Sequence, residues 1–404
     1  MEKKLVLVLL DACRTDYISE QNTPFLYKLK EDNRYYKSLI PGFGFCERTE
    51  ILVGKKPLDS GYFTAFGRSV EESPYNKLRI PFEILGKIET FFSSVFFSKL
   101  IRRIIWEIMK NKNGTYYPFR IPLKKLSNFS LTEDGPLNLI NTSQDSLYKI
   151  ASRVFKEAST SLDSKLSGSD EDRLNLIVEK INESYDFYPT YVSTLDAIGH
   201  NEGPNSRAIQ NGLKEIDAKL KVFYNKLQIM KNPPVVVFCG DHGMSQITYV
   251  MNIEREIFRI FKDKSLLNHF DMFLDSTMAR FWFDKQIFNE IKKLKDLLES
   301  KFKDKGFFLF QNQYKDYGIP ESNLYGDCIW ICNDGVLISP DYFSPANKKI
   351  NGMHGYQPLS PQHYGFAIFA GHNIQRKHFN KPMPLISIYK DIKNFLLDFK
   401  DVNK

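Results

Sequence analysis

The chain has 404 residues, of which 42% are hydrophobic and 26% are charged, and this composition excludes a disordered or fibrous protein. The net charge of +8 favours encounters with acidic partners such as phosphate esters, nucleic acids or anionic lipid surfaces, but it identifies none of them. The length fits one large domain with insertions, or two domains.

The first apolar run, Leu5 to Leu10, follows Met1-Glu2-Lys3-Lys4. It is too short for a signal peptide or a membrane span, so we expect a buried strand in a cytoplasmic protein. The five cysteines are an odd number without disulfide-type spacing, and they favour a reducing compartment.

Apolar or β-type runs that end close to ligand-type residues recur along the chain. They are Leu5 to Leu10 before Asp11, Tyr191 to Leu195 before Asp196, and Val235 to Phe238 before Asp241. The first and third are apolar throughout, as is typical of strands buried on both faces of a parallel sheet. Residues 205–230 have helical spacing and end before Pro233-Pro234, which gives a strand, helix, strand unit. We therefore predict an α/β fold with a mostly parallel central sheet flanked by helices, and functional groups beyond the carboxyl ends of the strands.

Two stretches break this alternating pattern. Residues from about 67 to 136 are rich in aromatic and basic residues, and those from about 253 to 345 mix β-type runs such as Met278 to Phe283 with a helical segment, Phe288 to Lys303. We interpret 1–404 as one catalytic domain with two insertions that cap its active face, although each insertion could equally be a plain covering layer for the sheet.

Four short motifs hold six residues of the types that bind divalent metal ions. The residues are Asp11, Asp196, His200, Asp241, His242 and His354. Carboxylate oxygens and neutral imidazole nitrogens both suit zinc and manganese. One helical turn or a tight loop can direct Asp196 and His200 at one ion, and a turn after the strand, with Gly240 and Gly243 as flexible flanks, would let Asp241 and His242 converge. A single Asp-His or His-Gly pair is more often a surface turn, but four such motifs in this order indicate a metal centre.

The segment from Asp196 to Pro204 reads Asp-Ala-Ile-Gly-His-Asn-Glu-Gly-Pro, and it resembles a signature of the alkaline phosphatase superfamily in its type I phosphodiesterase and nucleotide pyrophosphatase branch. Gly240 to Met244, and Gly352 to Tyr356 followed by a strand from Phe366 to Ala370, resemble two further signatures of that branch. The resemblance runs from Leu5 to about Gly371 through the core segments. It implies one ion held by Asp196, His200 and His354, and a second held by Asp11, Asp241 and His242, with zinc expected and manganese as the alternative.

The expected nucleophile is missing. In the superfamily a Ser or Thr, or a Cys-derived group in sulfatases, attacks beside the second ion, and the usual offset places that residue at Gly44. Three explanations compete: the attacker has shifted to Cys46 or Thr49, a native Ser or Thr has been replaced at Gly44, or metal-bound hydroxide attacks directly. Replacement distorts the family pattern least, while Cys46 fits a small buried hydrophobe better than a phosphoryl carrier. Arg14 and Arg48 are candidates for contacts to phosphoryl oxygens, or for structural ion pairs.

The segment from about 82 to 109 combines aromatic and basic residues. Its aromatic residues are Phe82, Phe91, Phe92, Phe96, Phe97 and Trp106, and its basic residues include Lys87, Lys99, Arg102 and Arg103. Such a segment could close over a lipid-linked substrate or rest on a membrane surface, but an amphipathic cap helix whose Phe face packs on the sheet is the commoner cause of this pattern. Charges interrupt the apolar runs too soon for a membrane span.

The sequence thus predicts a two-metal hydrolase of phosphate esters, most simply a phosphodiesterase that acts on a phosphate-ester substrate, a nucleotide among the candidates. No specific nucleic-acid binding is expected. A sulfatase or phosphomutase of the same fold is the alternative among enzymes, although Cys46 lacks the Cys-x-Pro-Ser-Arg context of sulfatases. A non-catalytic metal protein that binds a phosphorylated ligand is the alternative from another class, because Gly44 offers no nucleophile.

Overall fold

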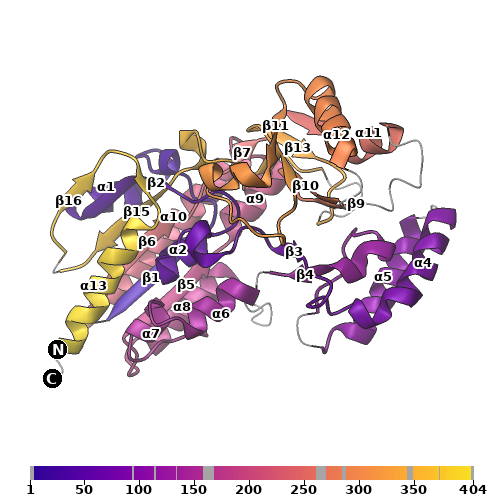
Figure 1. Cartoon of the computed structure of the whole chain (residues 1–404). Helices are drawn as coiled ribbons and strands as arrows, with labels where there is room; N and C mark the ends of the chain where they lie inside the picture. The colour runs from indigo at the N-terminus through magenta and orange to yellow at the C-terminus, as the bar shows by residue number, and fades with distance from the viewer. Residues whose placement is uncertain are drawn as a thin grey trace. The chain divides into compact units, whose positions relative to one another are not determined.

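A computed structural model describes residues 4–92, 95–112, 115–132, 134–157, 168–260, 270–283, 288–343, 349–372 and 374–401. The chain divides into two compact units, and each is interleaved with the other along the sequence (Figure 1). Unit 1 comprises residues 1–56, 136–246 and 350–404, and unit 2 comprises 57–135 and 247–349. The capping role expected for the two insertions stays a prediction.

Unit 1 is built on a mixed, mostly parallel sheet with the strand order β16-β2-β15-β6-β1-β5, and with β17 also paired to β2. The strands are β1 (Leu5–Leu10), β2 (Arg34–Ile40), β5 (Phe187–Val192), β6 (Val235–Gly240), β15 (Gly365–Ala370), β16 (Lys377–Phe379) and β17 (Met383–Pro384). The central strand β1 is parallel to both β5 and β6, whereas β15 is antiparallel to its neighbours β6 and β2. The predicted fold class is therefore confirmed.

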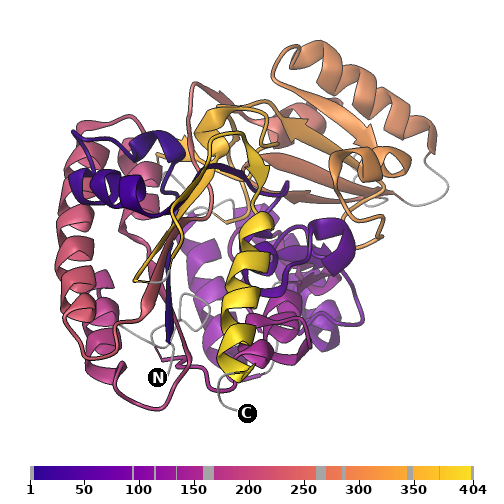
Figure 2. The same ribbon diagram turned by 90° about the vertical axis from the view of Figure 1, so that its left-hand side faces the viewer.

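Helices cover both faces of this sheet, because alternate side chains of each strand point to opposite faces. Val6, Val8 and Leu10 of β1 pack in one core with α1 (Pro24–Asp32), α8 (Asp170–Lys180), α9 (Thr194–Glu202) and α10 (Arg207–Gln228). Leu5, Leu7 and Leu9 pack in the other core with α2 (Glu47–Val53), α7 (Leu147–Ile150) and α13 (Ser387–Asp401). Figure 2 shows α13, in yellow, and α10, in rose, on opposite sides of the strands. Unit 1 also holds most of α6 (Asp134–Thr142) and the short pair β7 (Ser245–Gln246) and β14 (Gly352–Met353).

One predicted element needs correction. The run Tyr191 to Leu195 is not a strand: β5 begins at Phe187 and ends at Val192, and Leu195 already belongs to α9. The sequence pattern did not indicate the start of β5, because Pro189 lies within this strand and proline ordinarily interrupts a strand pattern. The predicted helix at 205–230 is confirmed as α10, which follows β5 and precedes β6.

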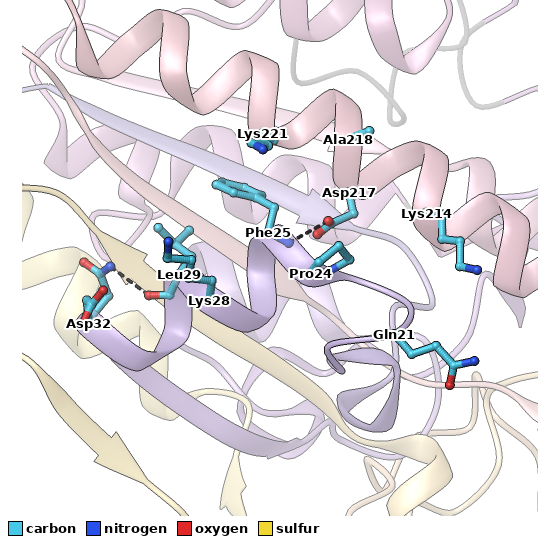
Figure 3. Close-up of a pocket in the computed structure, with 11 residues that line it drawn as sticks. Gln21, Pro24, Phe25, Lys28, Leu29, Asp32, Lys214, Asp217, Ala218 and Lys221 are labelled. Carbon is cyan, nitrogen blue, oxygen red and sulfur yellow. Dashed lines mark hydrogen bonds between the residues drawn. The ribbon is translucent and has the colours of Figure 1, made fainter.

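Asp217 of α10 fixes the beginning of α1. Its carboxylate accepts hydrogen bonds from the backbone N–H groups of Phe25, at 2.8 Å, and Leu26, at 3.0 Å (Figure 3). These donors lie in the first turn of α1, where the helix itself offers no acceptor. A groove of about 660 Å³ lies between the two helices at this point, and Lys28, Lys214 and Lys221 are among its lining residues.

Unit 2 contains a four-stranded antiparallel sheet and several helices. The sheet has the order β11-β12-β10-β9, formed by β9 (Phe270–Leu274), β10 (Met278–Phe283), β11 (Gly306–Phe310) and β12 (Cys328–Cys332). The remaining elements are α3 (Pro57–Ser60), β3 (Phe66–Arg68), α4 (Arg79–Phe92), α5 (Val95–Met109), β4 (Phe129–Leu131), β8 (Tyr249–Met251), α11 (Ile253–Ile260), α12 (Phe288–Lys301) and β13 (Val336–Ile338). A buried ion pair between Arg280 and Asp275, 2.7 Å apart, lies within this unit.

The aromatic and basic segment forms two helices, α4 and α5, where one cap helix was expected. Phe82 is buried, in line with the packing interpretation, while the side chains of Phe91, Phe92, Phe96 and Phe97 lie outside the described part of the chain. Within the described residues, every helix is too short or too polar to cross a bilayer.

Candidate metal centre

Three neighbouring parallel strands bring ligand-type residues to one edge of the sheet in unit 1. Asp11 follows the end of β1 directly, Asp241 and His242 follow the end of β6, and α9 with Asp196 begins two residues after β5. Because β5, β1 and β6 are adjacent and parallel, their carboxyl ends meet at this edge.

The first triplet consists of Asp196, His200 and His354, whose ligand atoms all lie within 4.8 Å of one another. Asp196 and His200 are one turn apart on α9, and His354 follows β14. Oδ1 of Asp196 is 3.2 Å from Nε2 of His200 and 3.6 Å from Nε2 of His354. This triplet is partly open to solvent.

The second triplet consists of Asp11, Asp241 and His242, also within 4.8 Å, and all three residues are buried. Nε2 of His242 is 3.0 Å from Oδ1 of Asp11 and 3.8 Å from Oδ1 of Asp241. The same Asp241 oxygen accepts hydrogen bonds from the backbone N–H groups of His242, at 2.9 Å, and Ala12, at 3.3 Å. These two bonds hold the Asp241 carboxylate against the loop that follows β1.

The two triplets form one centre. The rings of His242 and His354 stack with their centroids 4.3 Å apart, and the His200 ring is 5.2 Å from that of His354. The structure thus brings together all six predicted ligands, divided as the resemblance implies. That they bind metal ions stays a prediction.

Gly240 and Gly243 act through close packing and not, as we expected, through conformational freedom. A Cβ atom on Gly240 would lie 2.1 Å from the carbonyl oxygen of Cys13, and one on Gly243 would lie 1.9 Å from that of Gln362. Both distances are far below van der Waals contact. The loop that carries Asp241 and His242 is therefore fixed by neighbouring backbone on both flanks.

The hydrogen bonds of two imidazoles fit metal binding. Nδ1 of His200 lies 2.8 Å from the carbonyl oxygen of Gly352, and Nδ1 of His242 lies 2.8 Å from that of Gly243. A carbonyl oxygen can only accept, so each Nδ1 carries the proton, and in the neutral ring Nε2 holds a lone pair. Each lone pair then faces a carboxylate oxygen, which is repulsive unless a proton or a metal cation lies between them, and without metal, despite burial, the neighbouring carboxylates raise the pKa of both histidines. This arrangement fits a divalent ion at each triplet.

Two groups of the first triplet, Asp196 and His354, have pKa values that favour their ligand forms, whereas the pKa of His200 is raised, because its contact with Asp196 outweighs the effect of burial. Burial opposes ionisation of Asp196, but contact with His200 and the charge of His354 outweigh it and hold the pKa of Asp196 below its usual range. Burial and the charge of His242 hold the pKa of His354 well below its ordinary value. In the second triplet, burial raises the pKa of Asp11 to about 6, and the charge of Asp241 adds to this shift. A cation would remove that repulsion.

Two residues beside the second triplet were not predicted. The hydroxyl of Tyr191, on β5, donates a hydrogen bond to Oδ2 of Asp11. Glu47, at the start of α2, is buried and close enough to His242 and Asp241 for their charges to affect its pKa, which burial raises to about 7. The alternation of β5 could have indicated that Tyr191 is buried, but no sequence signal pointed either residue at the centre.

The predicted nucleophile positions offer no free nucleophile. Gly44 has a φ of +99°, a left-handed conformation that disfavours Ser or Thr. The buried thiol of Cys46 donates to the carbonyl oxygen of Phe43 at 3.1 Å, and burial raises its pKa well above the ordinary value. Thr49 lies in α2 with no accessible surface. None of these three positions presents an activated hydroxyl or thiolate.

The two predicted arginines make different contacts. Arg14 is almost buried and its guanidinium binds both carboxylate oxygens of Asp16, at 2.8 and 2.5 Å, which supports the structural ion pair. Arg48 is half-buried with its guanidinium carbon 5.0 Å from the centre of the Tyr191 ring. It therefore lies near the second triplet.

A family model for type I phosphodiesterases and nucleotide pyrophosphatases matches residues 112–357, which is more than half of the chain. Human GPI ethanolamine phosphate transferase 2, catalytic subunit, is 45% identical over 56 residues. That match spans 13% of this chain and only 6% of the transferase.

Solved structures of ectonucleotide pyrophosphatase/phosphodiesterase 5 share the fold. The murine protein, solved by itself and as an inactive threonine-to-alanine variant in complex with AMP, gives TM-scores of 0.67 and 0.68. The human protein gives 0.62. In each case the identity is 15%, and the similarity covers 98% of this chain and 95% of the solved chain. With the family model matching more than half of its length, this chain belongs to the type I phosphodiesterase/nucleotide pyrophosphatase family, a family of phosphate-ester hydrolases.

Proposed function

We propose that this chain hydrolyses phosphate diesters at a centre of two divalent metal ions, with zinc expected and manganese as the alternative. The observation that carries the proposal is the pair of Asp/His triplets, joined by the stack of His242 on His354. Bound cations would neutralise phosphoryl oxygens and lower the pKa of the attacking group. Membership of the family supports the reaction class.

The residues around the triplets have distinct roles in this proposal. The backbone carbonyls of Gly352 and Gly243 keep the proton of each histidine on Nδ1 and leave Nε2 for the ion. Tyr191 orients the Asp11 carboxylate. Arg48, over the ring of Tyr191, binds a non-bridging oxygen of the substrate, because its planar guanidinium matches two such oxygens.

Water is the attacker that we propose. The left-handed Gly44, the buried neutral thiol of Cys46 and the buried Thr49 each argue against a covalent intermediate on the protein. The murine structure with AMP is of a variant inactivated at a threonine, which is consistent with a different attacker in that protein. Its AMP ligand makes a nucleotide diester the first substrate to try.

The alternative is a metal-dependent protein that binds a phosphorylated ligand without turnover. Gly44 favours it for the same reason that it disfavours a covalent mechanism. The buried thiol of Cys46 gives no support to a sulfatase.

Metal content and hydrolysis of bis(p-nitrophenyl) phosphate separate these functions. We expect two ions per chain by mass spectrometry and turnover that a chelator abolishes, with the exposed Glu20→Gln variant as a matched control. Two bound ions without turnover of any phosphate or sulfate ester would favour the binding protein, and a chain that binds no metal would contradict both.

The route of attack is tested with a diester that is chiral at phosphorus. A single displacement by water inverts the configuration, whereas two displacements through a protein ester retain it. We expect inversion, and retention would overturn direct attack by water.

A further inference from the structure

The outer face of α5 in unit 2 carries an exposed aliphatic ridge. Leu100, Ile104 and Ile108 follow one another at intervals of four residues, so they lie in line along the helix. Their exposed fractions are 46%, 50% and 68%. The neighbouring helix α4 adds Ile80 and Ile84, with the same spacing and exposed fractions of 72% and 56%.

This ridge is not the packing face of α5. The adjoining side of the helix buries Ile101, Ile105 and Met109. Beside them, the buried guanidinium of Arg102 donates hydrogen bonds to the backbone carbonyls of Pro118, at 3.2 Å, and Ile121, at 2.7 Å. These contacts fix the rotation of α5 about its axis, so the aliphatic ridge cannot turn inward without breaking them.

Basic residues border the ridge. Lys99 and Arg103 are exposed and precede the ridge residues Leu100 and Ile104, whereas the exposed Glu107, which is paired with Lys110, precedes Ile108. Residues 77–112 hold eight Lys and Arg against three Glu, a net charge of +5 out of +8 for the whole chain. Trp106, half-buried on the same helix, lies with its ring 6.0 Å from that of the partly exposed Tyr117.

We propose that α5, with the adjoining end of α4, binds the surface of a membrane that contains anionic lipids, by placing the aliphatic ridge among the acyl chains. Interfacial helices combine an apolar face with Lys and Arg that reach the lipid headgroups. Protein interfaces, in contrast, are poor in Lys and owe most of their binding energy to aromatic anchors and Arg. The ridge is aliphatic and bordered by Lys99 and Arg103, so a lipid surface fits it better than a protein partner.

Binding of the full chain to vesicles tests the proposal without recourse to catalysis. We expect the chain to co-sediment with vesicles of phosphatidylcholine and phosphatidylserine and much less with phosphatidylcholine alone. Trp282 and Trp330 are buried in the sheet of unit 2, so the half-buried Trp106 should account for most of a fluorescence change. Because Trp106 lies on the side of α5 away from the ridge, we expect only weak quenching by brominated acyl chains.

Matched variants separate the contribution of the aliphatic ridge from that of the basic residues beside it. Ile104→Ser with Ile108→Ser should weaken binding by about tenfold or more, because two aliphatic side chains stay in water. Ile229→Ser, at an 85% exposed position after α10 in unit 1, removes a similar side chain and should bind as the wild type does. Lys99→Glu with Arg103→Glu should abolish the preference for phosphatidylserine.

Two outcomes would overturn the proposal. One is equal sedimentation of the wild type and the Ile104/Ile108 variant with phosphatidylserine vesicles, while circular dichroism shows both to be folded. The other is a dimer in analytical ultracentrifugation that the same variant dissociates, because a second copy of the chain would then cover the ridge.

Discussion

The rings of His242 and His354 stack at 4.3 Å with their planes inclined by 22°, although the two residues belong to different ligand triplets. Two imidazolium ions would repel each other at this distance, whereas two neutral rings that each face their own cation would not. The stack therefore places the two triplets side by side in one centre.

Loss of one triplet should leave the other triplet able to bind its metal ion. We expect Asp196→Asn to remove one ion per chain and Asp241→Asn to remove the other, with turnover of a diester at least about 100-fold lower in both. Mass spectrometry of dialysed protein gives the metal content, and Glu20→Gln controls for handling. Two ions retained in either variant would show that the triplets are not the ligand sets.

Tyr191 should matter to the second ion through its bond to Asp11. Tyr191→Phe is expected to weaken metal binding by about 10- to 100-fold, because the Asp11 carboxylate loses the donor that orients it. Tyr188→Phe is the matched control: Tyr188 lies on the same strand, but its hydroxyl donates to backbone carbonyls such as that of Glu183, at 3.0 Å. Competition with a chelating dye measures the affinity, and equal values for both variants would contradict this role.

Gly44→Ser tests the missing nucleophile. Because φ is +99° at this position, we expect a loss of stability of about 1–2 kcal/mol and no gain in turnover. Urea unfolding and diester hydrolysis measure the two quantities. A large gain in turnover, with retention at phosphorus, would instead identify residue 44 as the slot for a serine nucleophile.

Glu50 should make stability depend on pH. Burial raises its pKa from 4.5 to about 8, while its Oε2 accepts a hydrogen bond from the backbone N–H of Gly42 at 2.7 Å. Between these two values the native state keeps a proton that the unfolded state has lost, so this contribution to stability falls as the pH rises from 4.5 to 8.

Glu50→Gln removes this titration and keeps an acceptor for Gly42. We expect the variant to be more stable than the wild type near pH 8 and above, and the difference to vanish towards pH 5. Thermal unfolding across this range checks it, with Glu20→Gln as the control. A difference that does not vary with pH would rule out titration of Glu50 as the cause.

Asp217 should stabilise unit 1 through the first turn of α1. Asp217→Ala leaves the N–H groups of Phe25 and Leu26 without their acceptor, and we expect a loss of about 1–3 kcal/mol in the free energy of unfolding. Lys221→Ala, one turn further along α10 and exposed, should change it by less than about 0.5 kcal/mol. Equal free energies of unfolding for the two variants would mean that water replaces the Asp217 carboxylate at no cost.

The sequence predicted the parts of this centre that depend on strand order. Asp11 and Asp241 follow apolar runs that form β1 and β6, and the carboxyl ends of adjacent parallel strands meet at one edge, so their convergence could be expected from the sequence. Asp196 lies instead within α9, after a strand whose bounds the sequence did not indicate. The roles of Tyr191 and Glu47 could not, because they depend on which way a side chain turns after packing. The left-handed backbone of Gly44 could not be predicted either, because glycine adopts left-handed and right-handed conformations almost equally well.

The division of unit 1 into three stretches of sequence sets an order for the synthesis of the protein. On a growing chain, the second triplet is complete once His242 has been made. The first triplet must wait for His354, which is translated only after the second stretch of unit 2, residues 247–349. A ribosome-bound nascent chain that stops within that stretch thus holds all three residues of the buried triplet, but it lacks both His354 and Gln362, whose backbone packs against Gly243 in the loop of Asp241 and His242.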